Sequence, residues 1–154
     1  MKIDSDKLET KELDELEKIL KKYKVSIKVG ILGDGDNRED EASNATVGLV
    51  HEFGGVNHPE RSFLRMPLSG FFYKRLESSG LFKDEFKEII KEKGLESFAN
   101  KIAQVAVETV KGAFHTGGYG KWKPSNMDYK ENHQTLVESQ QLRNSITSEV
   151  KIND

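Results

Sequence analysis

Two segments near opposite ends of the chain alternate apolar and polar residues. From position 25 to position 31, valine and isoleucine stand at every second place, and a similar alternation returns at residues 146 to 152. A period of two puts successive side chains on opposite faces of an extended chain, so each segment is typical of a half-buried strand. The sequence therefore predicts β-strands over residues 25 to 32 and 146 to 152.

Between these segments, apolar residues recur every three or four places, which is the period of an amphipathic helix. The longest such stretch covers residues 95 to 114 and predicts the helix at the centre of the core. A shorter helix is predicted over residues 44 to 53, because Ser43 can cap its start and Gly54 with Gly55 can end it. Further helices are predicted over residues 6 to 24, from Pro67 to the Ser78-Ser79-Gly80 break, around residues 82 to 94 and around residues 139 to 144.

These elements predict a single α+β domain over residues 1 to 154, in which a small, mainly antiparallel sheet packs against the long helix and additional helices surround it. Two strands make a marginal sheet in water. We therefore expect a third strand near Val56, within an extended stretch of residues 56 to 65, or strands supplied by a neighbouring copy. The N-terminal helix of residues 1 to 24 can lie as an arm on an adjacent subunit.

The charge balance excludes a general nucleic-acid binder. The 154 residues include 24 Lys or Arg and 26 Asp or Glu, a net charge of −2, whereas nucleic-acid-binding domains usually carry a basic excess. The charge is unevenly spread, because residues 33 to 44 carry a net −4 and residues 111 to 130 a net +3. We expect the acidic segment to be an exposed loop.

Residues that could carry catalysis do not form a recognisable pattern. Cysteine is absent, which excludes disulfides, thiolate catalysis and cysteine zinc sites. His51, Glu52 and His58 lack the zinc-helix spacing, because position 55 is a glycine where that pattern needs histidine. We therefore expect no enzyme, no metal and no cofactor, and a hydrolase with a metal beside His51 or His58 is the minor alternative. No signal peptide and no membrane span of about 20 apolar residues is expected.

Aromatic and basic residues mix in a segment rich in glycine, asparagine and lysine. The mixture consists of Tyr119, Lys121, Trp122, Lys123 and Tyr129. Such a loop can stack on single-stranded bases, or it can serve as a protein interface or fold back on the core. The weak local charge favours the second interpretation, and both stay open.

Three blocks of sequence, taken in order, resemble a family of tailed-phage virion morphogenesis proteins, which are small head-tail connector and tail-completion proteins. The first block is VGLVHEFGG at residues 47 to 55, and the second is HPERSFLR at residues 58 to 65. The third combines GKWKP at residues 120 to 124 with LVESQQLRNSITSEV at residues 136 to 150. A VGIL strand precedes all three, as it does in the family.

The resemblance implies a structural virion protein without catalytic activity. Such a protein would form a homo-oligomeric ring, with six subunits expected and twelve as the alternative, at the head-tail junction or the tail end. Genomic DNA would pass through the ring without sequence recognition, and other neck or tail proteins would be its partners. The resemblance places it in the virion, and in the host cytoplasm during assembly, without a membrane. The alternative is a phage-encoded nucleic-acid-binding module that uses the loop of residues 119 to 129.

The PERSFLR block suggests how such a subunit would contact its neighbours. Phe63 and Leu64 stand between Arg61 and Arg65, and an apolar anchor flanked by guanidiniums suits an interface. The other interpretation is an intramolecular clasp between Glu60 and a neighbouring arginine. We expect the interface to include His51, Glu52, Phe53, Pro59, Glu60, Arg61, Phe63, Leu64, Arg65, Trp122, Leu142 and Arg143.

The acidic loop gains a role if the chain forms a ring. A ring needs two different surfaces that meet head to tail. The loop can meet the basic region of a neighbouring copy, or it can line the lumen, where it would repel phosphates and let DNA slide. The side chains concerned are Asp34, Asp36, Glu39, Asp40 and Glu41.

Overall fold

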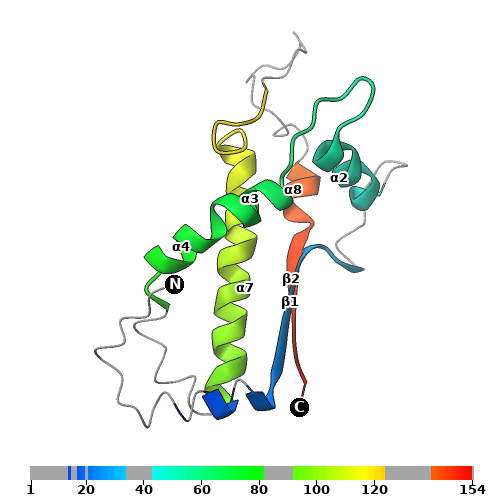
Figure 1. Cartoon of the computed structure of the whole chain (residues 1–154). Coiled ribbons are helices and arrows are strands. Elements are labelled where there is room, and N and C mark those ends of the chain that lie inside the picture. The colour runs from blue at the N-terminus through cyan, green and yellow to red at the C-terminus, as the bar shows by residue number, and fades with distance from the viewer. Residues whose placement is uncertain are drawn as a thin grey trace.

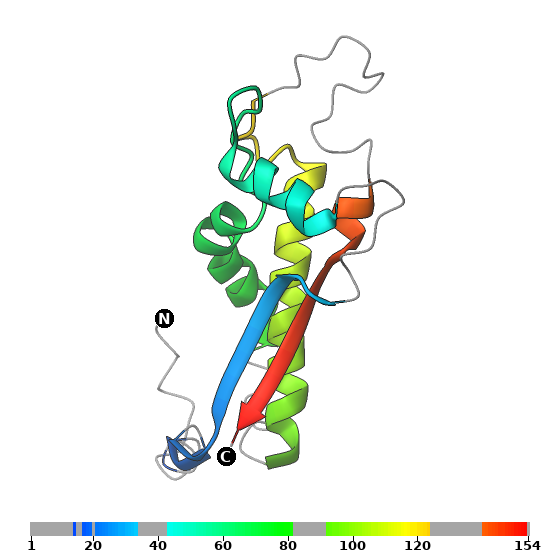
Figure 2. The same cartoon turned by 90° about the vertical axis from the view of Figure 1, so that its right-hand side faces the viewer.

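The computed structural model describes residues 14, 17 to 19, 21 to 33, 43 to 81, 92 to 123 and 140 to 153. A long helix is central to this part of the chain, with a β-ribbon along one side and two short helices across another (Figure 1, Figure 2). The elements are β1 (Lys24–Ile31), α2 (Asn44–Phe53), α3 (Arg65–Gly70), α4 (Phe72–Ser78), α7 (Glu92–His115), α8 (Gln140–Asn144) and β2 (Ile146–Asn153).

The two strands pair antiparallel and pack against α7, which confirms the α+β class and both predicted strands. Ile27 stands opposite Val150, so the apolar positions of both strands share one face. The opposite face carries the polar positions, where Lys28 Nζ lies 3.9 Å from the Glu149 carboxylate. The period of two in the sequence thus becomes one apolar and one solvated face.

The core has two clusters along α7. At one end, Val110 and Phe114 of α7 pack with Phe63, Leu142 and Ile146, all of them buried. The other end holds Leu95 and Phe98, with Ile19, Tyr23, Leu81, Ile102 and Ile152 packed against them. The prediction that this helix forms the centre of the core is confirmed for the described residues.

Helix α2 begins and ends where the sequence predicts. The Ser43 hydroxyl accepts a hydrogen bond from the Thr46 N–H at 3.1 Å, which is an N-cap. Gly54 ends the helix with a φ of 74°, and its N–H donates to the Val50 carbonyl at 2.8 Å. A Cβ at Gly48 would lie 3.1 Å from side-chain atoms of both Ile31 and Phe63, so α2 approaches the core closely at this glycine.

The prediction of a third strand near Val56 is wrong for the described residues, where the sheet has two strands. Residues 55 to 58 form a tight reversal instead, in which Gly55 and His58 exchange backbone hydrogen bonds of 2.8 and 3.2 Å. Gly54, whose φ of 74° favours glycine, permits this reversal, and Val56 at its tip is fully exposed. Within the expected extended stretch of residues 56 to 65, residues 56 to 58 belong to the turn, residues 59 to 64 lie in neither helix nor strand, and Arg65 begins α3.

The described end of the N-terminal segment contacts its own chain. Ile19 and Tyr23 pack against the cluster of Leu95 and Phe98 in α7. Most of residues 1 to 16 lie outside the described residues, so the arm of residues 1 to 24 on an adjacent subunit stays a prediction.

Replacing Gly54 by alanine should destabilise the protein, whereas replacing Gly55 should not. A Cβ at Gly54 would lie 2.9 Å from the Glu60 backbone nitrogen, and its φ of 74° with ψ of −177° suits only glycine. A Cβ at Gly55 would meet nothing within 4 Å. We expect Gly54→Ala to lower the free energy of unfolding by about 2 kcal/mol or more, measured by thermal denaturation. Equal stability of the two variants would contradict this account of the turn.

Candidate functional site

A buried glutamate joins the end of α2 to the start of α3. Glu52 lies in the last turn of α2 with only 4% of its surface exposed. Its carboxylate accepts backbone N–H hydrogen bonds from Phe63, Leu64 and Arg65 at 2.8, 2.9 and 3.0 Å. These N–H groups stand at the start of α3, where a helix leaves its donors without internal partners. Glu52 therefore caps α3 from a neighbouring helix.

Two side chains complete this arrangement. The Ser62 hydroxyl donates a hydrogen bond to the Glu52 carboxylate at 2.9 Å. The Ser62 hydroxyl oxygen also accepts a hydrogen bond from the Met66 N–H at 2.9 Å. Arg65 donates from Nε to the Glu52 carboxylate at 2.8 Å, and from Nη2 to the Glu52 carbonyl and the Glu60 carboxylate, both at 3.0 Å. We call Glu52, Ser62, Arg65 and the three N–H groups the clasp. The ion pair between Glu60 and Arg65, which borders the clasp, is the intramolecular contact that the sequence left open.

The clasp stabilises the ionised form of Glu52. Burial alone would raise the pKa of this carboxyl, but the Leu64 and Arg65 N–H groups, the Arg65 guanidinium and the Ser62 hydroxyl together lower it below its ordinary value. A lowered pKa in the folded state means that folding favours the carboxylate. The resulting stability is present above the ordinary carboxyl pKa and is lost as the pH falls through the lowered one.

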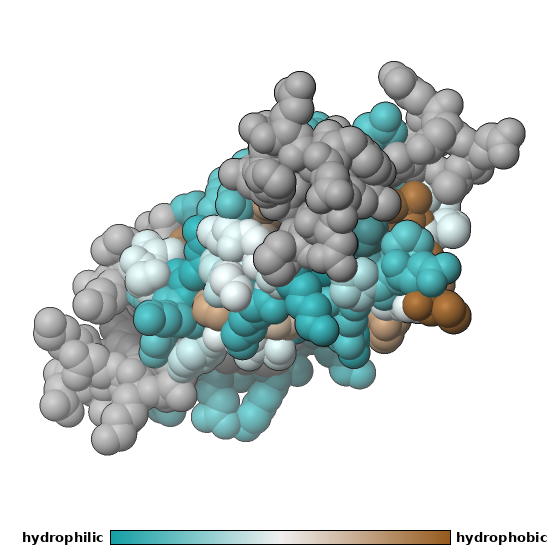
Figure 3. Space-filling model, turned by 90° about the horizontal axis from the view of Figure 1, so that it is seen from above, coloured by the Kyte–Doolittle hydropathy of each residue, from teal (hydrophilic) through white to brown (hydrophobic). Residues whose placement is uncertain are grey.

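Beside the clasp, one face of α2 presents apolar side chains to solvent. Leu49 is 60% exposed, Phe53 is 57% exposed, and Val50 and the neighbouring Val56 are exposed as well. We call these four residues the α2 patch. Figure 3 looks down on the end of the molecule where α2 lies, and hydrophobic surface gathers there at one edge. The Arg65 guanidinium lies 4.3 Å from the centre of the Phe53 ring, so the clasp directly borders the patch.

Several of the expected interface residues lie inside the molecule. Phe63 and Leu142 are 1% and 2% exposed and belong to the core cluster around α7. Arg61 is also buried, its Nη2 donates to the Lys123 carbonyl at 3.4 Å, and burial lowers its pKa. Among the others, Phe53, Glu60 and Arg65 are exposed, while His51, Pro59, Leu64, Trp122 and Arg143 are half-buried.

The described aromatic residues of the loop, Tyr119 and Trp122, contact the folded part of their own chain. Trp122 donates from its indole nitrogen to the Ser62 carbonyl at 3.1 Å, next to the clasp. The Tyr119 ring stacks on Phe71 with 4.3 Å between the ring centres. Both rings are thus in contact with their own chain, and Tyr129 lies outside the described residues.

The described part of the chain offers no group of three or more histidine, aspartate or glutamate side chains that could hold a metal ion. None of its described helices is long and apolar enough to cross a membrane. The acidic residues proposed for a lumen, which are Asp34, Asp36, Glu39, Asp40 and Glu41, lie outside the described residues.

Sequence reasoning missed Ser62 as a member of the clasp. A serine just ahead of a helix is an ordinary capping signal, so this residue could have been found. Glu52 was expected at an interface, and nothing local in the sequence indicates that a carboxylate in α2 would cap a different helix.

Comparisons with protein-family models, curated proteins and solved structures find no match to this chain. The described residues form an α+β fold in which the clasp borders an exposed apolar patch.

Replacing Glu52 by glutamine should destabilise the protein at neutral pH by about 2 kcal/mol, because an amide offers one acceptor oxygen and no charge to the clasp donors. The difference from the unsubstituted protein should shrink as the pH falls below about 4.3, the ordinary carboxyl pKa, because the unfolded chain then binds a proton at Glu52 while the folded chain still holds the carboxylate. The difference should be lost once the pH has fallen through the lowered pKa of the folded state. Urea denaturation at several pH values measures both effects.

Glu60→Gln is the matched control. The Glu60 side chain is 59% exposed and pairs with the same arginine, so its loss should cost less than about 0.5 kcal/mol. A Glu52→Gln variant with the same stability and pH profile as this control would contradict the central role of Glu52.

Proposed function

We propose that this chain is a structural subunit that assembles with copies of itself into a ring, as a neck or tail-completion component of a tailed-phage virion. Genomic DNA would pass through the ring without sequence recognition. The observation that carries the proposal is the α2 patch, an exposed apolar surface on a helix that the clasp fixes in place.

The physical argument concerns the cost of association. Leu49 and Phe53 stand four residues apart and share one face of α2, so they can enter a single pocket on a neighbour. Because the carboxylate of Glu52 is already saturated with hydrogen bonds, little ordering of this helix remains to be done on binding. Arg65, which is exposed beside Phe53, adds a guanidinium of the kind enriched at interfaces.

The clasp also bears on the resemblance to phage proteins. It joins the HEFGG segment to the PERSFLR segment, which are the two most specific blocks of that resemblance. Every contact in the clasp is a hydrogen bond or an ion pair within the chain, so a structural use of these blocks accounts for their residue types. This supports a structural protein over a hydrolase.

The nucleic-acid-binding alternative gains no support from the described aromatic residues. Tyr119 stacks on Phe71, and Trp122 packs edge-on against Phe114 with 5.8 Å between ring centres. Lys121 also lies over Phe71, at 5.3 Å from its centre. Base stacking would require these rings to leave their present contacts. Binding of single-stranded DNA that weakens steeply with salt would favour the alternative.

The purified protein should form closed rings of uniform mass, seen by light scattering and by negative-stain images of the same sample. Leu49→Ser and Phe53→Ser should each shift the protein toward monomer, because each removes an apolar side chain that we expect to be buried between subunits. Fold content should not change, since both side chains are more than half exposed in the single chain.

Tyr73→Ser is the matched control, since Tyr73 is a large exposed side chain, at 47%, that lies on α4 instead of α2. It should leave the ring mass unchanged. A protein that stays monomeric at high concentration and never enters viral particles would remove the proposed function.

A further inference from the structure

The β-ribbon has two outer edges, and no other described strand pairs with either of them. The sheet consists of β1 and β2 alone, so each strand has one side without a strand partner in the part of the chain that the structure describes. An isolated two-stranded ribbon is marginal in water, and an open edge presents N–H and C=O groups that can pair with another strand. The two edges differ in sequence, so they are two different surfaces.

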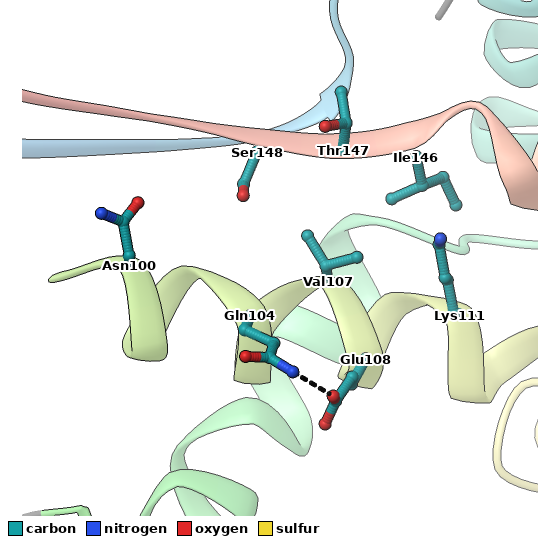
Figure 4. A pocket seen from close by; sticks show the side chains of 8 residues that line it. All are labelled: Asn100, Gln104, Val107, Glu108, Lys111, Ile146, Thr147 and Ser148. Atoms are coloured by element: carbon teal, nitrogen blue, oxygen red, sulfur yellow. Dashed lines mark hydrogen bonds between the residues drawn. The ribbon is translucent and has the colours of Figure 1, made fainter. Parts of the chain in front are cut away.

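A hollow lies beside the edge of β2. It has a volume of about 390 Å³, and its lining comes from α7 and from residues 146 to 148 of β2, without any residue of β1 (Figure 4). The Ser148 side chain points into it toward α7, and Val107 and Ile146 provide its apolar surface. Gln104, which donates to Glu108 at 3.1 Å, forms part of the polar side. A strand added to β2 would place side chains over this hollow.

The strand β1 carries side chains that suit this position. Val29 stands opposite Ser148 in the ribbon, so a second β1 added to the other edge of β2 in the same register would bring its own Val29 next to Ser148 and Val107. On the solvated face, Lys28 stands opposite Glu149. The added strand would place a second Lys28 beside Glu149, which gives complementary charges on both sides of that carboxylate.

We propose that β1 of one copy of this chain adds antiparallel to the outer edge of β2 of the next copy, in the register that the two strands have within the chain. This inference rests on the proposed ring and names its subunit contact. Because β1 meets β2 at each junction, the contact is head to tail, and open edges remain until the ring closes. Helix α2 lies on the same side of α7 as the ribbon, so the α2 patch can contact the same neighbour (Figure 1).

The absence of native cysteine permits a direct test. Ser26 and Lys151 are register partners, as are Lys28 and Glu149. Each residue is replaced by cysteine in a separate protein, the two members of a pair are mixed under assembly conditions, and the mixture is oxidised. The proposal expects a disulfide-linked dimer in each mixture at several-fold higher yield than in either protein alone.

The other results overturn the inference in distinguishable ways. Efficient cross-linking of Lys151→Cys or Glu149→Cys with itself would indicate a two-fold contact between β2 strands. Rings that form without a cross-link in either mixture would overturn strand pairing and leave the proposed function standing. Protein that forms no assembly at all would overturn both.

A charge placed in the hollow provides a second measurement. Ser148→Lys should weaken assembly by about tenfold, because a lysine at the mouth of the hollow opposes an incoming strand. Circular dichroism should show an unchanged fold, and light scattering gives the mass. Ser97→Lys on the exposed face of α7 is the control and should assemble normally. Equal assembly of the two variants would overturn the inference.

Discussion

The structure depends on one buried carboxylate. Glu52 accepts hydrogen bonds from the three backbone N–H groups of residues 63 to 65, and without this acceptor the buried Phe63 N–H would be unsatisfied. Phe63, whose N–H is one of the three, is 1% exposed and belongs to the core cluster around Val110 and Phe114 of α7. The hydrogen bonds of Glu52 therefore fix α3, and through Phe63 they connect α2 to the hydrophobic core.

The sequence predicts the elements with local periodicity well. The strands, α7 and the caps of α2 follow from patterns within a few residues, because a face that repeats every two or 3.6 residues already determines which side chains meet the core. Gly54 illustrates this, since a glycine after the last apolar turn marks the helix end at which its φ of 74° is observed. These parts of the fold need no knowledge of distant contacts.

The parts that the sequence did not reveal are those that depend on distant partners. Glu52 looks like an ordinary charged residue beside exposed Phe53, and only the approach of residues 62 to 65 shows that its carboxylate is buried. The Trp122 indole N–H likewise donates a hydrogen bond to the Ser62 carbonyl, which lies 60 residues away in the sequence. The third strand near Val56 was expected because a two-stranded sheet needs further partners, and a rule about sheets does not say which chain supplies them.

The proposed ring requires a rigid subunit, and the clasp supplies part of that rigidity. A closed ring requires the same rotation at every junction, and a subunit with a loose joint between its contact surfaces would also permit open spirals. The α2 patch and the ribbon are joined through the core, where Gly48 lets α2 lie against Ile31 of β1 and Leu142 of α8. Glu52 holds the C-terminal end of α2 against α3. A helix held at its middle and at its C-terminal end gives the proposed contact surfaces one fixed angle, which is the property that closure of the proposed ring requires.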